Sequence, residues 1–308
     1  MPTVLKDGLV GAGIGTAAII PGISGATIAL IFGSFKKIVN AAGKLFSKQF
    51  LKNLLILLPF GIGLLIAVAA LIKPFQLAFE YCMFAIICLF AAFIIGSLPG
   101  IVDNVRGQKP TKINIVVLIV SIIIAVSVGV LSIVFDLSNV IQTMFNDGKW
   151  YLYVILFALG IIAATGVTVP GFSASLLLLA TGFYYPILNC VHFDFIKNNP
   201  GKFFGIIGVF FVGIFVGFFL WSKLMSFLLD KHKQSTHYAV LGFILGFLVS
   251  IFANSQMVGY IKGAVEKENG MLLDIILTPI FVAIGIIVAY TIVRYSRKHK
   301  NEETVVEE

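Results

Sequence analysis

Charged residues are scarce in this chain. Asp, Glu, Lys and Arg make up 12% of its 308 residues, about half of the roughly 25% that is usual in soluble domains. Hydrophobic residues make up 59%, and the mean hydropathy is +1.04. A soluble fold cannot bury so much apolar surface, and a disordered chain has the opposite composition. The sequence therefore excludes a soluble enzyme. It predicts an all-α integral membrane protein, because helices satisfy their own backbone hydrogen bonds in lipid.

Cysteine is also rare, and two patterns that would indicate a bound cofactor are missing. Cys82, Cys88 and Cys190 have no metal-ligand spacing, so we expect them to pack as small apolar side chains. No G-x-x-x-x-G-K-[ST] pattern is present, which argues against ATP as the direct energy source. We therefore predict no metal site and no cofactor.

What the chain has in abundance is long apolar runs. A spanning helix needs about 20 apolar residues, and six stretches satisfy this requirement: 53–72, 77–97, 114–135, 203–221, 237–253 and 272–293. Two further apolar regions, 8–35 and 150–188, are broken near the middle by Pro21-Gly22 and Pro170-Gly171. Proline ends a helix and glycine permits the turn that follows. Each region is therefore predicted to be a re-entrant helical hairpin, with a pair of kinked full-length helices as the alternative.

The two broken regions are copies of one another at a shift of 149 residues. Residues 11–40 read GAGIGTAAIIPGISGATIALIFGSFKKIVN, and residues 160–189 read GIIAATGVTVPGFSASLLLLATGFYYPILN. The identities include Pro, Gly, Ser, Thr and Asn, which generic apolar sequence would not match together. The chain thus divides into repeat 1 (1–148), repeat 2 (149–293) and a tail (294–308). Because three spans per repeat are an odd number, the repeats are predicted to be inverted, as in many secondary transporters.

The basic residues predict the orientation of these spans. With the N-terminus inside, 16 Lys and Arg residues fall on the inner side and 6 on the outer side. Lys and Arg collect in cytoplasmic loops, so we expect both termini in the cytoplasm. The net charge of +8 then reflects the orientation of the chain in the membrane and does not indicate a surface that binds nucleic acid. Trp150 and Trp221 fall at predicted span ends, where amphipathic rings prefer to lie.

The hairpin tips are the candidate binding site. Each tip opens a half-helix whose free N–H groups and positive dipole end suit an anion. Glycine allows close approach, and hydroxyl groups add donors. The alternative is a simple kink in which each serine bonds back to its own helix. The candidate substrate-binding residues are Pro21, Gly22, Ser24, Gly25, Thr27, Pro170, Gly171, Ser173 and Ser175.

The pattern G-x4-T-x4-PGISGATIALIFG, repeated as PGFSASLLLLATG, resembles the polyprenyl-phosphate (undecaprenyl-phosphate) translocase family over nearly the whole chain. The resemblance implies a flippase in the bacterial cytoplasmic membrane. Such a protein would return undecaprenyl phosphate from the outer to the inner leaflet for cell-wall polymer synthesis. It also implies that Pro21, Gly22, Ser24, Gly25, Gly171 and Ser173 line the headgroup site. The chain departs from the common family pattern at Ala26 and Lys36.

Ionisable residues near the apolar runs are candidates for function. Lys73, Lys223 and Arg106 are candidate phosphate-entry residues. The alternative for Lys73 and Lys223 is that they snorkel to the lipid headgroups. The alternative for Arg106 is that it only helps to set the topology. Glu80 and His237, at the predicted starts of corresponding spans, are candidates for proton coupling. The alternative for Glu80 is an acid that the dipole favours at a helix start. The alternative for His237 is a polar residue at the membrane interface. The coupling ion, proton or sodium, and the oligomeric state stay open.

Two rival functions use the same hairpins. An undecaprenyl-diphosphate phosphatase-like membrane enzyme has a motif that resembles PGxSRSG, and its arginine is missing from both PGISGAT and PGFSAS. Phosphoryl transfer also needs charge stabilisation, and usually a metal or a base, so we predict that the chain is not an enzyme. A small-anion secondary transporter or channel would need no lateral opening for a lipid tail.

Overall fold

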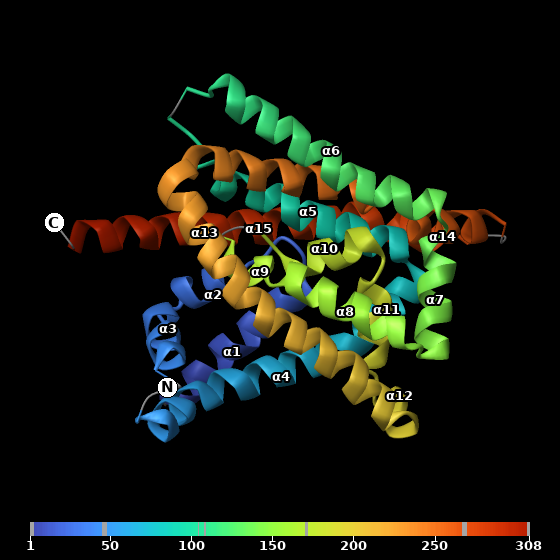
Figure 1. The fold of residues 1–308 in the computed structure, drawn as a ribbon, viewed down its shortest axis with the longest axis horizontal. Helices are drawn as coiled ribbons and strands as arrows, with labels where there is room; N and C mark the ends of the chain where they lie inside the picture. Colours follow the sequence, from blue (N-terminus) through green and yellow to red (C-terminus); the bar gives the residue numbers. More distant parts are fainter. Residues whose placement is uncertain are drawn as a thin grey trace.

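The computed structural model describes residues 3–44, 48–103, 105–107, 109–169, 172–266 and 270–306, and all regular structure within them is helical (Figure 1). The helices are α1 (Thr3–Ile19), α2 (Gly25–Ile31), α3 (Phe35–Gly43), α4 (Phe50–Tyr81), α5 (Met83–Val102), α6 (Lys112–Val134), α7 (Leu137–Asp147), α8 (Trp150–Ala163), α9 (Thr165–Thr168), α10 (Ala174–Thr181), α11 (Tyr184–Cys190), α12 (Phe193–Asn198), α13 (Pro200–Ser250), α14 (Ser255–Val265) and α15 (Leu272–Val306).

Among the described residues, five helices are long and apolar enough to cross a membrane: α4, α5, α6, α13 and α15. Their outward faces carry large apolar side chains, such as Leu65, Ile123 and Phe215. Exposed apolar surface on this scale is unusual for a soluble monomer and is what lipid-facing helices require. The chain is therefore a multi-pass, all-helical membrane protein, as its composition predicts.

The predicted spans 203–221 and 237–253 lie in two helices, 200–231 and 233–250, which meet at a kink and share the label α13. α13 runs through both and bends at His232, where φ is −135° and ψ is 40°. The span boundaries around Cys82 also differ from the prediction. α4 continues through Pro74 to Tyr81, and α5 begins at Met83 instead of residue 77. A break at Cys82 has no local signal, because cysteine is neither a helix breaker nor a capping residue.

Two parallel helix pairs form the lower half of the view in Figure 1. In α1, a Cβ atom at Gly11 would lie 2.1 Å from the Phe60 carbonyl oxygen of α4, and one at Gly15 would lie 2.5 Å from that of Leu64. The contact advances in the same direction along both helices, so they run parallel. α8 and the first half of α13 (200–231) pack likewise, with a Cβ at Gly160 falling 2.3 Å from the Phe210 carbonyl oxygen. Only glycine permits such close backbone contact.

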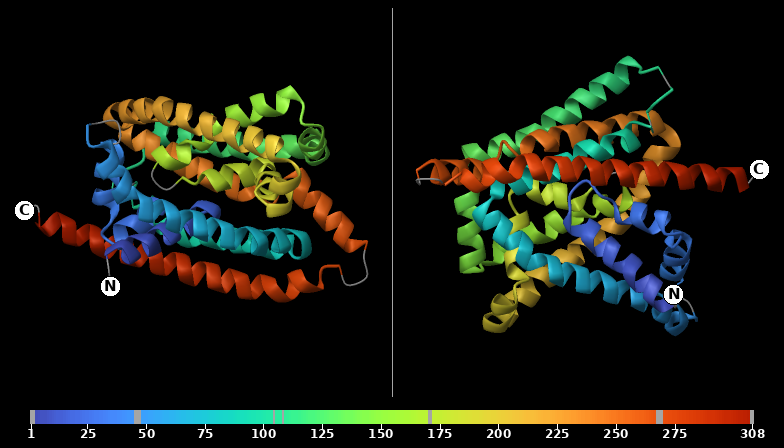
Figure 2. Two further views of the ribbon diagram at one scale, coloured as in Figure 1. Left: turned by 90° about the horizontal axis from the view of Figure 1, so that it is seen from below. Right: turned by 180° about the vertical axis from the view of Figure 1, so that it is seen from behind.

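Two further parallel pairs join helices that are distant in sequence. α5 packs on α15, where a Cβ at Gly285 would lie 2.7 Å from the Ala92 Cβ. The second half of α13 (233–250) packs on α6, where a Cβ at Gly242 would lie 2.5 Å from the Leu118 carbonyl oxygen. Each of these pairs takes one helix from either side of residue 149. The N-terminal and C-terminal halves of the chain are therefore interlocked (Figure 2).

Both ends of the described chain lie at the same end of the molecule, which also carries the bend in α13 (Figure 1). α7, α12 and α14 lie at the opposite end. α15 continues as a helix to Val306, through most of the predicted tail 294–308. At residue 297 it is tied to α5: Arg297 pairs with Asp103 at 2.7 Å and donates to the Pro99 carbonyl oxygen at 2.9 Å.

Candidate functional site

The first hairpin is formed by α1 and α2, joined by residues 20–24. Gly22 has φ of +90°, and a Cβ on it would lie 2.7 Å from the Ile94 nitrogen of α5. Pro21 and Ile23, on either side of Gly22, are buried. The tip is therefore packed against the backbone of α5. Its arms are unequal, at 17 and 7 residues, because α1 begins before residue 8 and α2 ends before residue 35.

Ser24 occupies the N-cap position of α2 with extended φ and ψ angles of −94° and 129°. Among the described residues its hydroxyl makes no capping hydrogen bond. Gly25 and Thr27, which follow it, are half-buried. The Ser24 hydroxyl thus does not cap its own helix, in contrast to the simple-kink interpretation, in which each serine bonds back to its own helix.

The second hairpin is formed by α8 and α9 on one side and α10 on the other. Pro170 and Gly171, at its predicted tip, lie outside the described residues. Ser173 takes the N-cap position of α10, and its Oγ lies 2.7 Å from the Oγ of the buried Ser175. A Cβ at Gly166 would lie 2.4 Å from the Ala174 nitrogen. The two arms therefore touch directly beside the tip.

A buried hydrogen bond joins the two hairpin regions. The Tyr184 hydroxyl, at the start of α11, donates to the Ile19 carbonyl oxygen at the end of α1 over 3.0 Å. The Tyr184 ring packs on Phe79 and Phe90, with centroid distances of 5.4 and 6.0 Å. The sequence gives no local sign of this role for Tyr184, since its partner is 165 positions away.

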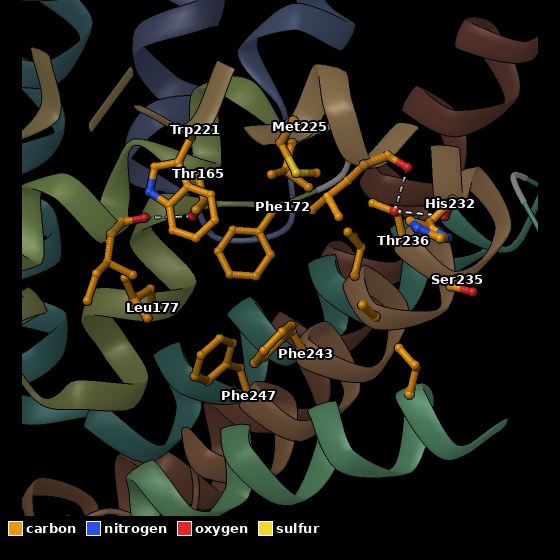
Figure 3. Close-up of a pocket in the computed structure, with 16 residues that line it drawn as sticks. Thr165, Phe172, Leu177, Trp221, Met225, His232, Ser235, Thr236, Phe243 and Phe247 are labelled. Carbon is orange, nitrogen blue, oxygen red and sulfur yellow. Dashed lines mark hydrogen bonds between the residues drawn. The ribbon is translucent and has the colours of Figure 1, made fainter. Parts of the chain in front are cut away.

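A cavity of about 430 Å³ lies beside the second hairpin (Figure 3). This volume is within the range of small-molecule sites, roughly 300–1,000 Å³. The second hairpin, both halves of α13 and α6 form its walls. The lining residues are Val117, Ile162, Thr165, Val169, Phe172, Leu177, Trp221, Met225, Leu228, His232, Ser235, Thr236, Ala239, Val240, Phe243 and Phe247. Nothing in the sequence marked it, because it forms between segments that are distant along the chain.

The polar groups of the cavity bond mainly to its own walls. Thr165 Oγ1 donates to the Ile162 carbonyl oxygen at 2.7 Å, and Thr236 Oγ1 donates to that of His232 at 2.9 Å. Trp221 Nε1 donates to a carbonyl oxygen of α8 at 2.8 Å. Trp221 was expected at a span end, whereas it lies within α13, because the helix does not stop at residue 221.

Comparison with known proteins decides the family. The model of the undecaprenyl phosphate translocase-like family matches residues 14–268. The chain belongs to this family. The match includes both Pro-Gly turns, the residues that line the cavity and the bend in α13, whereas the start of α1 and all of α15 lie outside it.

Two curated relatives carry the name polyprenyl-phosphate transporter. The protein from Staphylococcus aureus is 27% identical over 256 residues, which covers 79% of this chain and 84% of the relative. The protein from Vibrio cholerae is 26% identical over 262 residues, which covers 80% of this chain and 77% of the relative. No solved structure is significantly similar to this chain. The family and both relatives are named for transport, not for an enzymatic reaction.

The three candidate phosphate-entry residues of this family member lie on the surface. Lys73 is exposed inside α4, and not at its end as predicted, since the helix runs on to Tyr81. Lys223 is exposed on α13, two residues from the cavity-lining Trp221; two residues on a helix turn by about 200°, so the two side chains leave opposite faces. Arg106 is exposed between α5 and α6. None of the three lines the cavity.

The two candidates for proton coupling have different surroundings. Glu80 is exposed in the last turn of α4. The helix-start interpretation of Glu80 is therefore wrong, because the carboxylate lies at the negative end of a helix dipole. His237 is half-buried in the second half of α13. It adjoins Thr236 in sequence but does not line the cavity.

The structure also places a buried carboxylate that the sequence reading missed. Asp274, in the first turn of α15, is 1% exposed. Its Oδ1 accepts a hydrogen bond from the Ala85 nitrogen at 2.8 Å, and its Oδ2 accepts one from the Tyr260 hydroxyl at 2.6 Å. The available signal was an acid within the apolar run 272–293. Within the described residues, no group of three His, Cys, Asp or Glu side chains could hold a metal ion.

A second missed acid stabilises the first hairpin. Asp7 on α1 is buried and forms an ion pair with Lys37 of α3. The Lys37 ammonium also lies 5.5 Å from the ring centroid of Phe60 on α4. Repeat 2 has Leu156 and Pro186 at the corresponding positions. This contact is therefore peculiar to the first hairpin.

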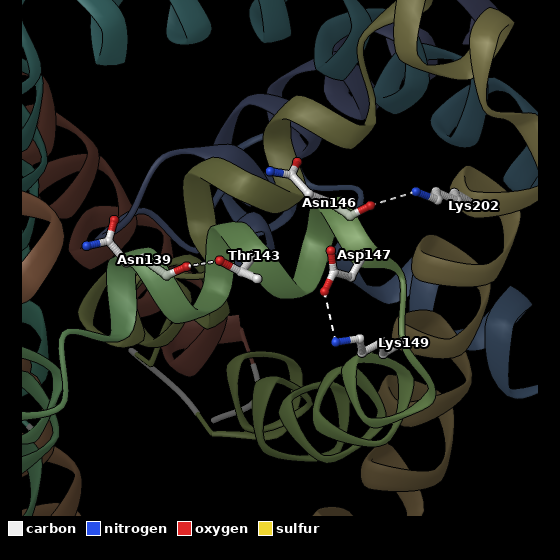
Figure 4. Close-up of polar contacts among 6 residues, drawn as sticks. All are labelled: Asn139, Thr143, Asn146, Asp147, Lys149 and Lys202. Carbon is white, nitrogen blue, oxygen red and sulfur yellow. Dashed lines mark hydrogen bonds and ion pairs between the residues drawn. The ribbon is translucent and has the colours of Figure 1, made fainter.

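Lys149 and Lys202, two of the six basic residues predicted on the outer side, form polar contacts with residues at the end of α7 (Figure 4). Lys149 pairs with Asp147 at 3.0 Å, and Lys202 Nζ donates to the Asn146 carbonyl oxygen at 2.9 Å. Hydrogen bonding and charge attraction from Asp147 raise the pKa of Lys149. Cations suit the C-terminal end of a helix, so both lysines serve this helix end.

Proposed function

We propose that this chain moves undecaprenyl phosphate, or a closely related polyprenyl phosphate, from the outer to the inner leaflet of the bacterial cytoplasmic membrane. Both termini are cytoplasmic in this proposal. The observation that carries it is the pair of broken hairpins, joined by the Tyr184–Ile19 hydrogen bond, in a chain of the translocase-like family. The recovered lipid would serve cell-wall polymer synthesis.

The parallel pairing of α1 with α4 supports a re-entrant first hairpin. Because the two helices run the same way, the chain returns to its starting side between them. α2 is the returning arm, and its seven residues span about 10 Å. That is well short of a hydrocarbon core of roughly 30 Å. The same reasoning applies to α8 and the first half of α13.

The helix breaks at Cys82 and His232 support two inverted repeats, 1–148 and 149–293. They are 150 positions apart, and their φ and ψ angles are similar, at −147° and 52° for Cys82 and −135° and 40° for His232. Each break separates a helix packed on a hairpin arm from a helix packed on the opposite half of the chain. Corresponding helices also run in opposite directions in Figure 1, α4 against the first half of α13, and α6 against α15.

The hairpin tips would hold the phosphate through backbone and hydroxyl groups. Ser24 is not engaged in capping among the described residues, and Ser173 lies beside Ser175. The described tip residues carry no formal charge. Burying an unassisted phosphate in hydrocarbon is very costly, and fixed dipoles and donors offset part of that cost. Pro170 and Gly171 belong to this proposed site by their place in the repeat.

Transport would proceed by rocking of one half against the other around this site. The lipid enters from the outer leaflet with its tail still in the bilayer, its phosphate docks at the tips, and the site opens inward. Cys82 and His232 are the hinge positions, because each holds a backbone already outside the helical region. Glu80 and His237 remain the candidates for coupling this cycle to a proton gradient.

The test is reconstitution in liposomes with a polyprenyl phosphate whose leaflet position is followed over time. Movement faster than in empty liposomes supports the proposal. No acceleration at any of several pH gradients overturns it. Inorganic phosphate released from the diphosphate form would point to the enzyme instead. A Ser24→Ala, Ser173→Ala double variant with unchanged transport would remove these hydroxyls from the mechanism.

A further inference from the structure

The cavity beside the second hairpin has an apolar body, with a group of three polar side chains at one end, away from Thr165 and Trp221. In Figure 3, Phe172, Phe243 and Phe247 lie in its middle, whereas His232, Ser235 and Thr236 gather at one end. An apolar cavity is a poor site for water, so its natural occupant is a hydrocarbon chain. A ligand that fills it from end to end would be apolar along most of its length and polar at its tip.

Beside the polar end lies one buried donor that has no hydrogen-bond partner among the described residues. Ser235 Oγ donates to Asn114 Oδ1 at 2.7 Å. Asn114 itself is 2% exposed, and among the described residues its Nδ2 has no hydrogen-bond partner. Leaving a buried amide donor unpaired costs about 1–3 kcal/mol. Asn114 does not itself line the cavity, and it is linked to the polar end through Ser235.

The charge around this end is mainly positive. Lys231 and Lys233 flank His232 and are exposed. Gln234 Nε2 donates to the Lys109 carbonyl oxygen at 3.3 Å, which brings the loop before α6 to the same place. The exposed Asp230 is an acid beside it. An excess of cations favours an anionic ligand group.

We propose that this cavity holds the first isoprene units of a prenyl monophosphate, with the phosphate at the end formed by His232, Ser235 and Thr236. This inference rests on the proposed function and adds to it an inward-facing position, distinct from the hairpin tips. The bend in α13 lies at the end of the molecule that carries both termini (Figure 1), which is the cytoplasmic end in the proposed topology. The apolar body reaches Val169 and Phe172, directly beside the second tip.

The wall residue Trp221 provides a direct binding assay. The chain has two tryptophans, and the other, Trp150, is 76% exposed at the start of α8. In a Trp150→Phe variant, all tryptophan fluorescence comes from the cavity. Farnesyl phosphate titrated into this purified protein should give a saturable change in Trp221 emission. Inorganic phosphate, farnesol and phosphatidylglycerol are the comparison ligands, and an equal response to farnesol or phosphatidylglycerol overturns the proposed specificity.

Filling the cavity should abolish this response. Ala239→Phe places a ring inside the cavity and should weaken farnesyl phosphate binding by about tenfold or more. Val249→Phe, on the exposed face of the same half of α13, is the matched control and should bind normally. Ala239→Leu repeats the test with a smaller side chain if the first variant does not fold. Unchanged binding in both Ala239 variants overturns the proposal.

Ser235→Ala tests the polar end separately, and it should weaken farnesyl phosphate binding more than farnesol binding. The liposome assay keeps the two proposals distinguishable. A wild-type protein that moves polyprenyl phosphate but shows no Trp221 response overturns the cavity site and leaves the proposed function in place. A protein that binds farnesyl phosphate through Trp221 but moves no lipid overturns the proposed function and not the cavity.

Discussion

At the scale of single residues, two charged side chains of α15 hold the two ends of α5. Asp274 accepts a hydrogen bond from Ala85 in the first turn of α5, and Arg297 donates to Pro99 in its last turn. An acid at the N-terminal end and a base at the C-terminal end both complement the helix dipole. One helix can supply both because α5 and α15 run parallel.

We therefore expect Asp274→Ala to destabilise the protein. The substitution leaves the Ala85 N–H without its side-chain acceptor and leaves the Tyr260 hydroxyl with only its longer contact to the Tyr81 carbonyl oxygen, at 3.3 Å. An unpaired buried donor costs about 1–3 kcal/mol. Asp274→Asn keeps one acceptor and should cost less. The melting temperature in detergent, with Tyr260→Phe as the control for the hydroxyl alone, checks this. Equal melting temperatures for Asp274→Ala and the wild type would contradict it.

Gly22 gives a second prediction at this scale. Gly22→Ala combines an unfavourable positive φ with a Cβ 2.7 Å from the Ile94 nitrogen, so a loss of about 1–3 kcal/mol is expected. Gly33→Ala is the matched control, since Gly33 also has positive φ, +65°, but no described atom lies within 4 Å of its added Cβ. Thermal melting and liposome transport measure both variants. Similar losses in the two would mean that contact with α5 does not matter.

At the scale of elements, parallel helix pairs joined through glycine account for most of the packing. Gly11 on α1 and Gly160 on α8 occupy matched positions, and each faces a carbonyl oxygen of the neighbouring helix. Small residues at such contacts are what membrane helices use to approach closely, since lipid supplies no hydrophobic drive. The hairpin arms are thus held by backbone proximity.

Gly11→Leu and Gly160→Leu should each separate a hairpin arm from its partner helix and abolish transport. Gly61→Leu on α4 and Gly208→Leu on α13 are the controls, because no described atom lies within 4 Å of a Cβ at either position. Size-exclusion profiles and melting temperatures report on folding, and the liposome assay reports on transport. Full activity in Gly160→Leu would rule out tight packing of the second hairpin as a requirement.

At the scale of the whole molecule, polar contacts are concentrated at the two ends, and the apolar helix faces lie between them. The end with both termini carries the bend in α13, and the opposite end carries α7, where Lys149 and Lys202 are bound (Figures 1 and 4). The proposed orientation puts the first end in the cytoplasm because Lys and Arg are more numerous there.

Cysteine labelling in whole cells tests this orientation. The native Cys82, Cys88 and Cys190 are first replaced by alanine. Arg106→Cys and Lys149→Cys then place one exposed thiol at each end of the molecule. A membrane-impermeant maleimide should label only Lys149→Cys in intact cells and both variants in opened membranes. If only Arg106→Cys were labelled in intact cells, the topology would be the reverse of the proposed one.

The sequence by itself determined the helical membrane class, the apolar runs and the positions of the Pro-Gly breaks. These follow from composition and from local backbone chemistry, which each segment carries within itself. The tertiary structure alone decided the helix breaks at Cys82 and His232, the burial of Asp274 and the cavity at Trp221. Their causes are contacts between distant segments, such as the 189 positions between Asp274 and Ala85. No local pattern encodes a contact of that kind, because it depends on which helix faces meet in space.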